Sequence, residues 1–132
     1  MNSTAKDRRP LSPHLQIYKP QLTSSLSIFH RIAGVVLSFG LIIFVAWLAA
    51  LAGGPESYSS FTLCAQSNFG QVILFGLTLA FFFHLCCGIR HLFWDAGLFL
   101  DLKGAYKTGY FALAATIVLT LILWLNVYGI SL

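Results

Sequence analysis

The stretch of sequence that decides the fold lies at residues 71–89 and reads "QVILFGLTLAFFFHLCCGI". It contains no Asp, Glu, Lys or Arg, and its length matches the roughly 20 residues that a helix needs to cross a bilayer. Two further uncharged runs of similar length, 32–54 and 110–130, stand on either side of it. Because a segment in lipid must hydrogen-bond its own backbone, each run predicts a transmembrane helix.

The composition excludes an ordinary soluble domain. Of the 132 residues, 58% are hydrophobic and 9% are charged, whereas soluble globular proteins carry about 25% charged residues. The length fits one domain. We therefore expect an all-α integral membrane protein with three transmembrane helices.

Basic residues predict the orientation of the chain. They lie before the first apolar run and between the second and the third: Lys6, Arg8, Arg9, Lys19, Arg31, Arg90, Lys103 and Lys107. The positive-inside rule places the N-terminus and the second loop in the cytoplasm. These charges are too few and too scattered to predict a nucleic-acid partner; the expected surroundings are membrane lipid.

Two segments are expected along the chain. Residues 1–22 contain three prolines and predict a polar cytoplasmic arm. Residues 23–132 predict a single three-helix membrane domain with helices at about 23–53, 68–91 and 107–130. Between the first two, a short polar loop is expected at 56–70, with room for an interfacial helical turn. The sequence shows no cleavable signal peptide and no long Arg/Ser-rich presequence. This favours a multi-pass protein of the bacterial inner membrane, or a mature organellar chain, over an uncleaved nuclear-encoded precursor. Of the two membranes, we expect the bacterial inner membrane rather than the mitochondrial inner membrane.

A histidine inside the decisive stretch requires a physical reason. His84 shares a helical stripe with Gly76, Ala80 and Gly88 at i, i+4 spacing. Small residues beside an imidazole leave room for a flat group such as haem, whose iron binds neutral imidazole. A helix-packing seam with a hydrogen-bonded histidine, or a proton relay, explains the same pattern. The residues alone leave these alternatives open.

The position of the other histidines bears on a second haem ligand. His84 precedes Arg90 by six residues, which places it roughly 9 Å deeper at 1.5 Å per residue. We expect His14, His30 and His91 to lie too near the surface to reach the far side of a haem at that depth. Three helices also make a poor closed bundle. The chain is therefore expected to form half of a bundle and of a haem site, with the second iron ligand from another membrane subunit.

Two further polar pairs stand near the same membrane face. Ser27 and Arg31 are one turn apart and offer donors to a quinone carbonyl, the charged donor favouring the negative charge that follows the first electron. Arg31 and His30 would alternatively pair with haem propionates, and Arg31 would also serve as a plain snorkelling charge. His91 and Asp95, at i, i+4 spacing, suit a proton path from the cytoplasm or a simple interfacial ion pair.

Two motifs resemble a known family. "SIFHRIAG" at residues 27–34 and "HLCCGIRHLFWD" at residues 84–95 are similar to the S-x-x-H-R-x-x-G and H-x-x-x-G-x-R-H-x-x-x-D signatures of the cytochrome b subunit of succinate dehydrogenase. The opening "RPLSPHLQIYKPQLTSSLSIFHR" resembles the same family in its alphaproteobacterial and mitochondrial branch. The similarity extends from residue 9 through the third apolar run.

The resemblance implies a function. Such subunits are three-helix anchors that hold one haem b together with a second three-helix anchor subunit. They dock an iron–sulfur subunit and a flavoprotein subunit, and electrons pass from succinate to ubiquinone. By this resemblance His84 is the axial ligand of the haem iron, while Ser27 and Arg31 contact the quinone. His30 lies near the haem propionates, and His91 and Asp95 match the end of the second motif.

Three other functions remain as alternatives. A fumarate reductase anchor would work in the reverse direction. A haem-free structural anchor would only dock soluble subunits. A small proton-conducting membrane protein would use Arg31, His84 and His91 without such partners. In every version that involves succinate dehydrogenase, this chain is a subunit of the enzyme and does not oxidise succinate by itself.

Overall fold

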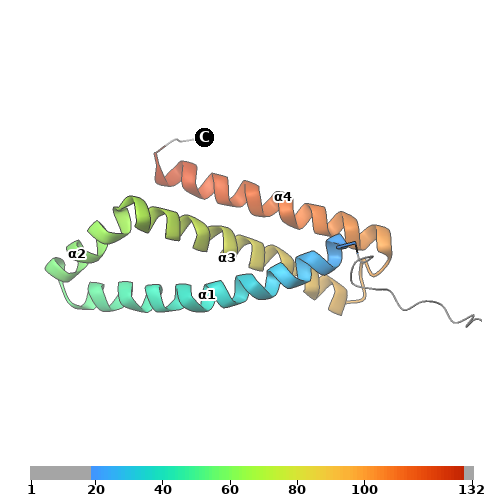
Figure 1. The fold of residues 1–132 in the computed structure, drawn as a ribbon, viewed down its shortest axis with the longest axis horizontal. Helices are drawn as coiled ribbons and strands as arrows, with labels where there is room; N and C mark the ends of the chain where they lie inside the picture. Colours follow the sequence, from blue (N-terminus) through green and yellow to red (C-terminus); the bar gives the residue numbers. More distant parts are fainter. Residues whose placement is uncertain (1–18, 130–132) are drawn as a thin grey trace, which may run out of the picture.

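The computed structural model describes residues 19–129, and this part of the chain forms four helices. Three are long, α1 (Leu22–Ala52), α3 (Asn68–Asp95) and α4 (Leu102–Val127), and the short α2 (Pro55–Gln66) stands between α1 and α3. In Figure 1, α3 returns beside α1, and α4 runs back along α3. The three long helices are long and apolar enough to cross a membrane. The prediction of an all-α membrane protein with three spanning helices is confirmed.

The helix ends differ in part from the expected ones. α3 continues past residue 91 to Asp95, and α4 begins at Leu102 instead of near residue 107. An apolar run marks only the part of a helix that faces lipid, and the helix continues into polar residues at the interface. The expected arm 1–22 and the domain end near 132 extend beyond the described residues, so that division stays a prediction.

Residues 56–70, expected to be a short polar loop, contain most of α2, a helix of 12 residues. Pro55 stands in its first turn and is followed by Glu56. Proline fits this position because the first helical N–H groups have no partner within the helix, and an acidic residue there complements the helix dipole. Gly54 precedes α2 with a φ of 92°, a value that glycine adopts without strain.

Side-chain caps fix the starts of the two later spans. Ser67 accepts a hydrogen bond from the Gly70 N–H at 3.1 Å at the start of α3. Asp101 does the same for the Gly104 N–H at 3.0 Å at the start of α4. Such caps satisfy donors that the first turn of a helix leaves free. Both later spans therefore begin at a residue whose side chain caps the first turn.

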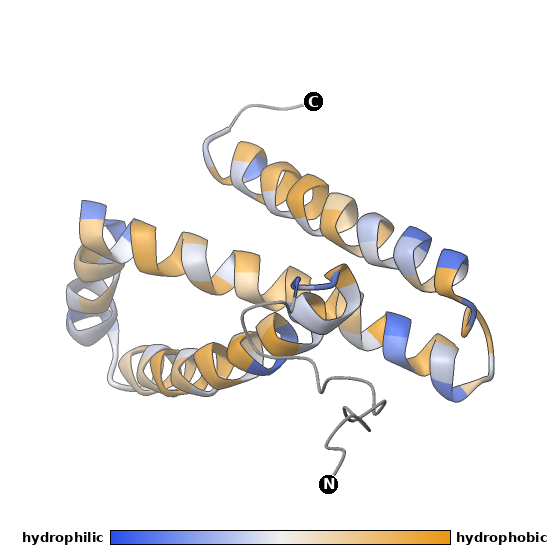
Figure 2. Cartoon of the chain, turned by 45° about the vertical axis from the view of Figure 1, so that its right-hand side comes forward, coloured by the Kyte–Doolittle hydropathy of each residue, from blue (hydrophilic) through white to orange (hydrophobic). Residues whose placement is uncertain are grey.

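The helices pack through small residues. α4 buries a seam made of Gly104, Ala105, Gly109, Ala112, Thr116 and Thr120. Large side chains such as Phe69 and Phe111 are instead about three-quarters exposed. This inside-out pattern is expected in lipid, where close backbone approach drives helix association. Figure 2 shows it directly: apolar residues cover the middle of the long helices, and hydrophilic ones gather where α3 ends and α4 begins.

Candidate functional site

Three histidines meet where α1 crosses α3. The His30 and His84 rings stack with their centroids 4.0 Å apart and their planes within 12° of parallel. The His91 ring lies 5.2 Å from His30 in a tilted arrangement. His30 thus bridges two histidines that are two turns apart on α3.

A hydrogen bond orients the His84 ring. Its Nδ1 lies 3.2 Å from the backbone carbonyl oxygen of His30. A carbonyl can only accept, so this hydrogen bond requires the proton on Nδ1, and in the neutral ring the lone pair then lies on Nε2. A histidine that binds a metal commonly has this arrangement, with one ring nitrogen held by a carbonyl and the other free for the metal.

Gly34 makes room for the same ring. A Cβ atom built on Gly34 would lie 3.2 Å from Cε1 and 3.7 Å from Nδ1 of His84. Elsewhere on the His84 stripe, a Cβ at Gly76 or Gly88 would meet nothing within 4 Å among residues 19–129, apart from the backbone of its own helix. The space beside those two glycines is therefore not filled by helix packing within the described residues.

The His30 ring reaches that of His84 although its backbone lies nearer the end of the helix pair where α3 ends. The reason is the register of α1 against α3: Gly34 faces His84, and Gly40 faces Leu77. His30 therefore comes level with the turns between His84 and His91. The expectation that His30 cannot reach the far side of a haem bound at His84 stays a prediction. Stacked face to face, His30 and His84 still cannot bind one iron from opposite sides, because their nitrogens do not point toward each other along one axis.

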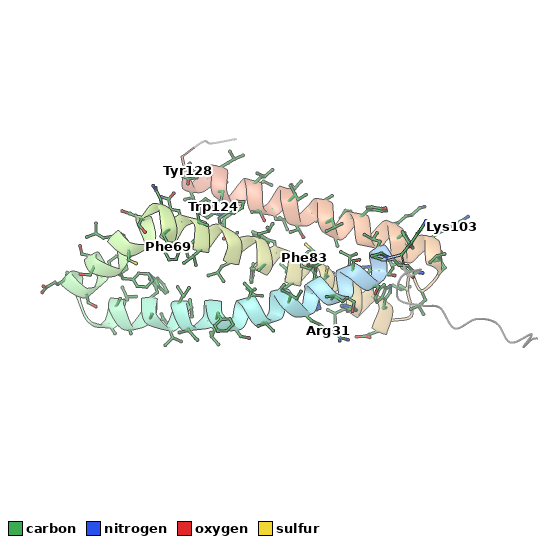
Figure 3. The ribbon with its side chains drawn as sticks, viewed as in Figure 1. Arg31, Phe69, Phe83, Lys103, Trp124 and Tyr128 are labelled. Atoms are coloured by element: carbon green, nitrogen blue, oxygen red, sulfur yellow. The ribbon has the colours of Figure 1, made fainter. Side chains whose placement is uncertain are left out.

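Ser27 and Arg31 lie on α1 on either side of His30. Ser27 is half-buried and Arg31 is exposed. Figure 3 shows Arg31 on the side of α1 that faces away from α4. Within residues 19–129, no hydrogen bond or ion pair engages the Arg31 guanidinium. Its donors are available to a group outside this chain.

His91 and Asp95 share a face of α3, but no hydrogen bond or ion pair joins them in the described part of the chain. His91 instead packs edge-on against Trp94, with the ring centroids 5.1 Å apart. Asp95 is exposed at the last residue of α3. The suggested role of the pair in proton transfer stays a prediction.

Arg90 has a role that the sequence reasoning missed, because it treated this residue only as a topological charge. Arg90 is 4% exposed, donates from Nε to Thr108 Oγ1 at 3.1 Å and from Nη2 to the Ala105 carbonyl at 2.9 Å. Its guanidinium also lies 3.8 Å from the centroid of a Trp94 ring. Arg90 therefore fastens α3 to α4. The sequence signal that could have indicated this role is the position of Arg90 inside the second motif, close to His84.

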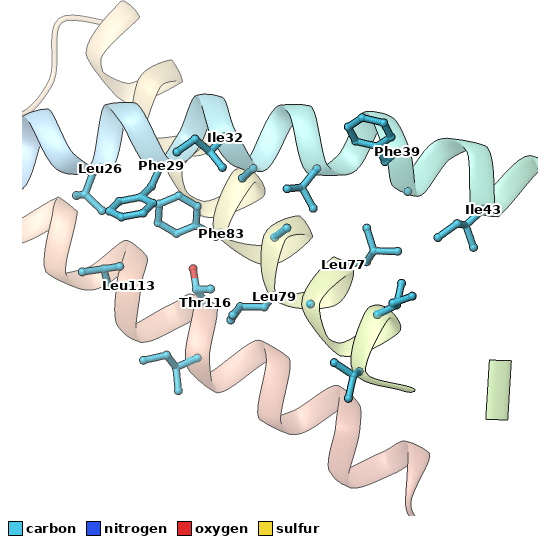
Figure 4. A pocket seen from close by; sticks show the side chains of 18 residues that line it. Leu26, Phe29, Ile32, Phe39, Ile43, Leu77, Leu79, Phe83, Leu113 and Thr116 are labelled. Atoms are coloured by element: carbon cyan, nitrogen blue, oxygen red, sulfur yellow. The ribbon is translucent and has the colours of Figure 1, made fainter. Parts of the chain in front are cut away.

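Two cavities between the long helices are lined by residues other than the six predicted site residues. An apolar cavity of about 740 Å³ lies between α1, α3 and α4; Figure 4 shows its walls, among them Phe29, Phe83 and Leu113. A second cavity of about 500 Å³ lies between α3 and α4 beside Arg90. None of the six predicted site residues lines either cavity. Neither cavity is therefore a site built around the histidines.

Comparison with known proteins gives one consistent family. Residues 5–123 match the model of the succinate dehydrogenase/fumarate reductase transmembrane subunit. The chain is 42% identical over 118 residues to the succinate dehydrogenase cytochrome b556 subunit of Rickettsia felis, covering 89% of this chain and 92% of that one. It is 46% identical over 122 residues to the cytochrome b560 subunit of Reclinomonas americana (89% and 85% covered). It is 36% identical over 122 residues to the cytochrome b556 subunit of Paracoccus denitrificans (92% and 94% covered). The chain therefore belongs to the family of succinate dehydrogenase/fumarate reductase transmembrane subunits.

Proposed function

We propose that this chain is the haem-binding membrane anchor of a succinate dehydrogenase and forms part of its ubiquinone-reduction site. Its relatives are named as cytochrome b subunits of that enzyme. In this proposal the chain carries haem b and helps to deliver electrons from succinate to ubiquinone, while flavoprotein and iron–sulfur subunits oxidise succinate.

The contact between the His84 ring and the His30 carbonyl is the observation that carries the proposal. Its Nδ1 is engaged by the His30 carbonyl at 3.2 Å, so the lone pair of Nε2 is available to a haem iron. When bound, the haem supplies an iron that gains and loses one electron. In the described residues, no three His, Cys, Asp or Glu side chains are grouped to hold a metal ion. A haem iron needs only one imidazole from this chain.

A second three-helix anchor subunit would complete the site. His30 cannot be the opposite ligand, because its ring is stacked on that of His84. The free space beside Gly76 and Gly88 would accommodate the haem or a helix of that partner. The three long helices would then form half of the complete bundle. A second imidazole from the partner would then hold the haem iron together with His84.

Arg31 and Ser27 are proposed to contact the quinone. A quinone carbonyl oxygen accepts hydrogen bonds, and the exposed guanidinium of Arg31 is a donor that favours negative charge on it. Arg31 is also positioned to pair with a haem propionate. His30 is also proposed to lie near a haem propionate; its Nε2 is buried and has no hydrogen-bond partner in the described residues. His91 and Asp95 would carry protons toward the quinone from the cytoplasmic side.

The proposed location is the bacterial inner membrane with the N-terminus in the cytoplasm. All three relatives described above are named as succinate dehydrogenase subunits, which favours succinate oxidation over fumarate reduction as the physiological direction.

Purification of the complex through a tag on this chain tests the proposal. We expect a flavoprotein, an iron–sulfur protein and a b-type absorption spectrum to co-purify. His84→Leu should abolish or perturb the low-spin haem spectrum. An unchanged spectrum in a correctly assembled variant would exclude His84 as the ligand, and a wild-type complex without haem would favour a purely structural anchor.

The quinone role of Arg31 is tested by two electron acceptors. Arg31→Ala should slow ubiquinone reduction and leave succinate oxidation by a soluble artificial acceptor nearly normal. Arg90→Ala is the matched comparison, because Arg90 fastens α3 to α4 and its loss should lower both rates through poorer assembly. If Arg31→Ala lowers both rates together, Arg31 is needed for assembly and not for the quinone.

A further inference from the structure

The His84 ring is held on three sides by α1. The His30 carbonyl accepts from Nδ1 at 3.2 Å, the His30 ring covers one face at 4.0 Å, and Gly34 borders the Cε1 edge. All three contacts come from a single turn of one helix. The orientation of His84 therefore depends on α1 as well as on its own helix.

Gly34 permits the His84 ring to come close to the His30 carbonyl. Residues four apart share one helix face, and a helical carbonyl points toward the N–H four residues later. An imidazole that reaches the His30 carbonyl from α3 must consequently pass over residue 34. A Cβ there would lie 3.2 Å from His84 Cε1, which is closer than ordinary van der Waals contact, so an alanine would push the ring away by a few tenths of an ångström.

The hydrogen bond also affects the electron density of the ring. A histidine whose Nδ1–H is donated to an acceptor is a stronger electron donor at Nε2. A stronger donor favours ferric over ferrous iron, and hydrogen bonding to an axial ligand is one of the ways in which proteins adjust the potential of a haem. A weaker or bent hydrogen bond would therefore raise the midpoint potential.

We propose that Gly34 and the His30 carbonyl form a positioning site that sets the orientation and donor strength of the His84 imidazole, and thereby the midpoint potential of the haem. This inference rests on the proposed function, because it requires His84 to be the ligand. It assigns Gly34 a role in positioning and none in catalysis.

The test compares two alanine substitutions on α1 in the complete purified complex. Gly34→Ala would press on His84. The control, Gly40→Ala, would press on the Leu77 side chain, with its Cβ 2.8 Å from Leu77 Cδ2. Both add one methyl group to the same helix at its contact with α3. We expect Gly34→Ala to raise the midpoint potential in a redox titration and to shift the ferric low-spin EPR signal, and Gly40→Ala to leave both at their wild-type values.

The outcomes separate this inference from the proposed function. If His84→Leu shows that His84 is the ligand and Gly34→Ala retains haem with wild-type potential and EPR signal, the positioning role is refuted. Equal shifts in both alanine variants would also refute it, since general helix packing would then be responsible. If Gly34→Ala fails to assemble, redox-difference infrared spectra of the wild-type complex with ¹⁵N-labelled histidine decide. They should show the ligand imidazole with a hydrogen-bonded Nδ1–H, and a free or absent Nδ1–H would overturn the proposal.

Discussion

The contact between α3 and α4 depends on Arg90, and replacing Arg90 by methionine should open it. The substitution keeps a long side chain but removes the hydrogen bonds to Thr108 and Ala105 and the contact with Trp94. Side-chain hydrogen bonds in membrane proteins contribute about 0.6 kcal/mol on average and up to about 1.7 kcal/mol. A cation–π contact adds about 0.5–2 kcal/mol. We therefore expect Arg90→Met to destabilise this contact by about 2–3 kcal/mol.

Cys87 provides the assay. It is 1% exposed and lies one turn before Arg90 on α3, so a maleimide reaches it only when the helices separate. In a background where Cys64 and Cys86 are replaced by alanine, the labelling rate of Cys87 in the assembled complex reports the open population. A loss of 2–3 kcal/mol corresponds to labelling about 30- to 150-fold faster. Lys103→Met is the control, since Lys103 is exposed (Figure 3).

Two results would contradict this reasoning. If Arg90→Met is labelled no faster than Lys103→Met, the buried guanidinium does not hold the helices together. If Arg90→Lys is labelled as slowly as the wild type, charge alone is sufficient and the fork geometry is irrelevant. We expect Cys87 in Arg90→Lys to be labelled about tenfold faster than in the wild type, and so more slowly than in Arg90→Met. An ammonium group cannot make both hydrogen bonds in the same plane.

Three further substitutions test the packing, each measured as a change in the thermal stability of the purified complex. Gly70→Ala should lower the stability of the complex by more than about 2 kcal/mol, because a Cβ there would lie 2.6 Å from the carbonyl oxygen of Ala65. A wild-type melting temperature would show that the corner between α2 and α3 can adjust. Gly109→Ala should lower the stability by about 1–2 kcal/mol, since its Cβ would approach Leu26 Cδ1 to 2.9 Å. An unchanged melting temperature would mean that α1 and α4 separate freely at this point. Thr120→Val should change stability by less than about 1 kcal/mol, because the buried hydroxyl donates only to a carbonyl one turn earlier on α4; a larger loss would indicate that it bonds to another helix.

Much of the fold could be predicted from the sequence because the signals are local. A charge-free run near 20 residues specifies a spanning helix wherever it occurs, and the stretch around His84 did so without reference to the rest of the chain. The motifs around His30 and His84 led to the family that the comparisons support. α2 was underestimated because its short polar sequence lacks the hydrophobic periodicity on which helix prediction depends.

The site could be predicted only in part. The sequence by itself determined three spans and the place of one imidazole within the second span, but not how the helices lie against one another. Only the tertiary structure decided that His30 stacks on His84, that Gly34 makes room for the ring and that Arg90 turns inward to α4. The physical reason is that the length and polarity of a run set its place in the bilayer. The register of two helices, and the sides on which they touch, follow from packing between residues far apart in the chain. No local sequence pattern records such packing.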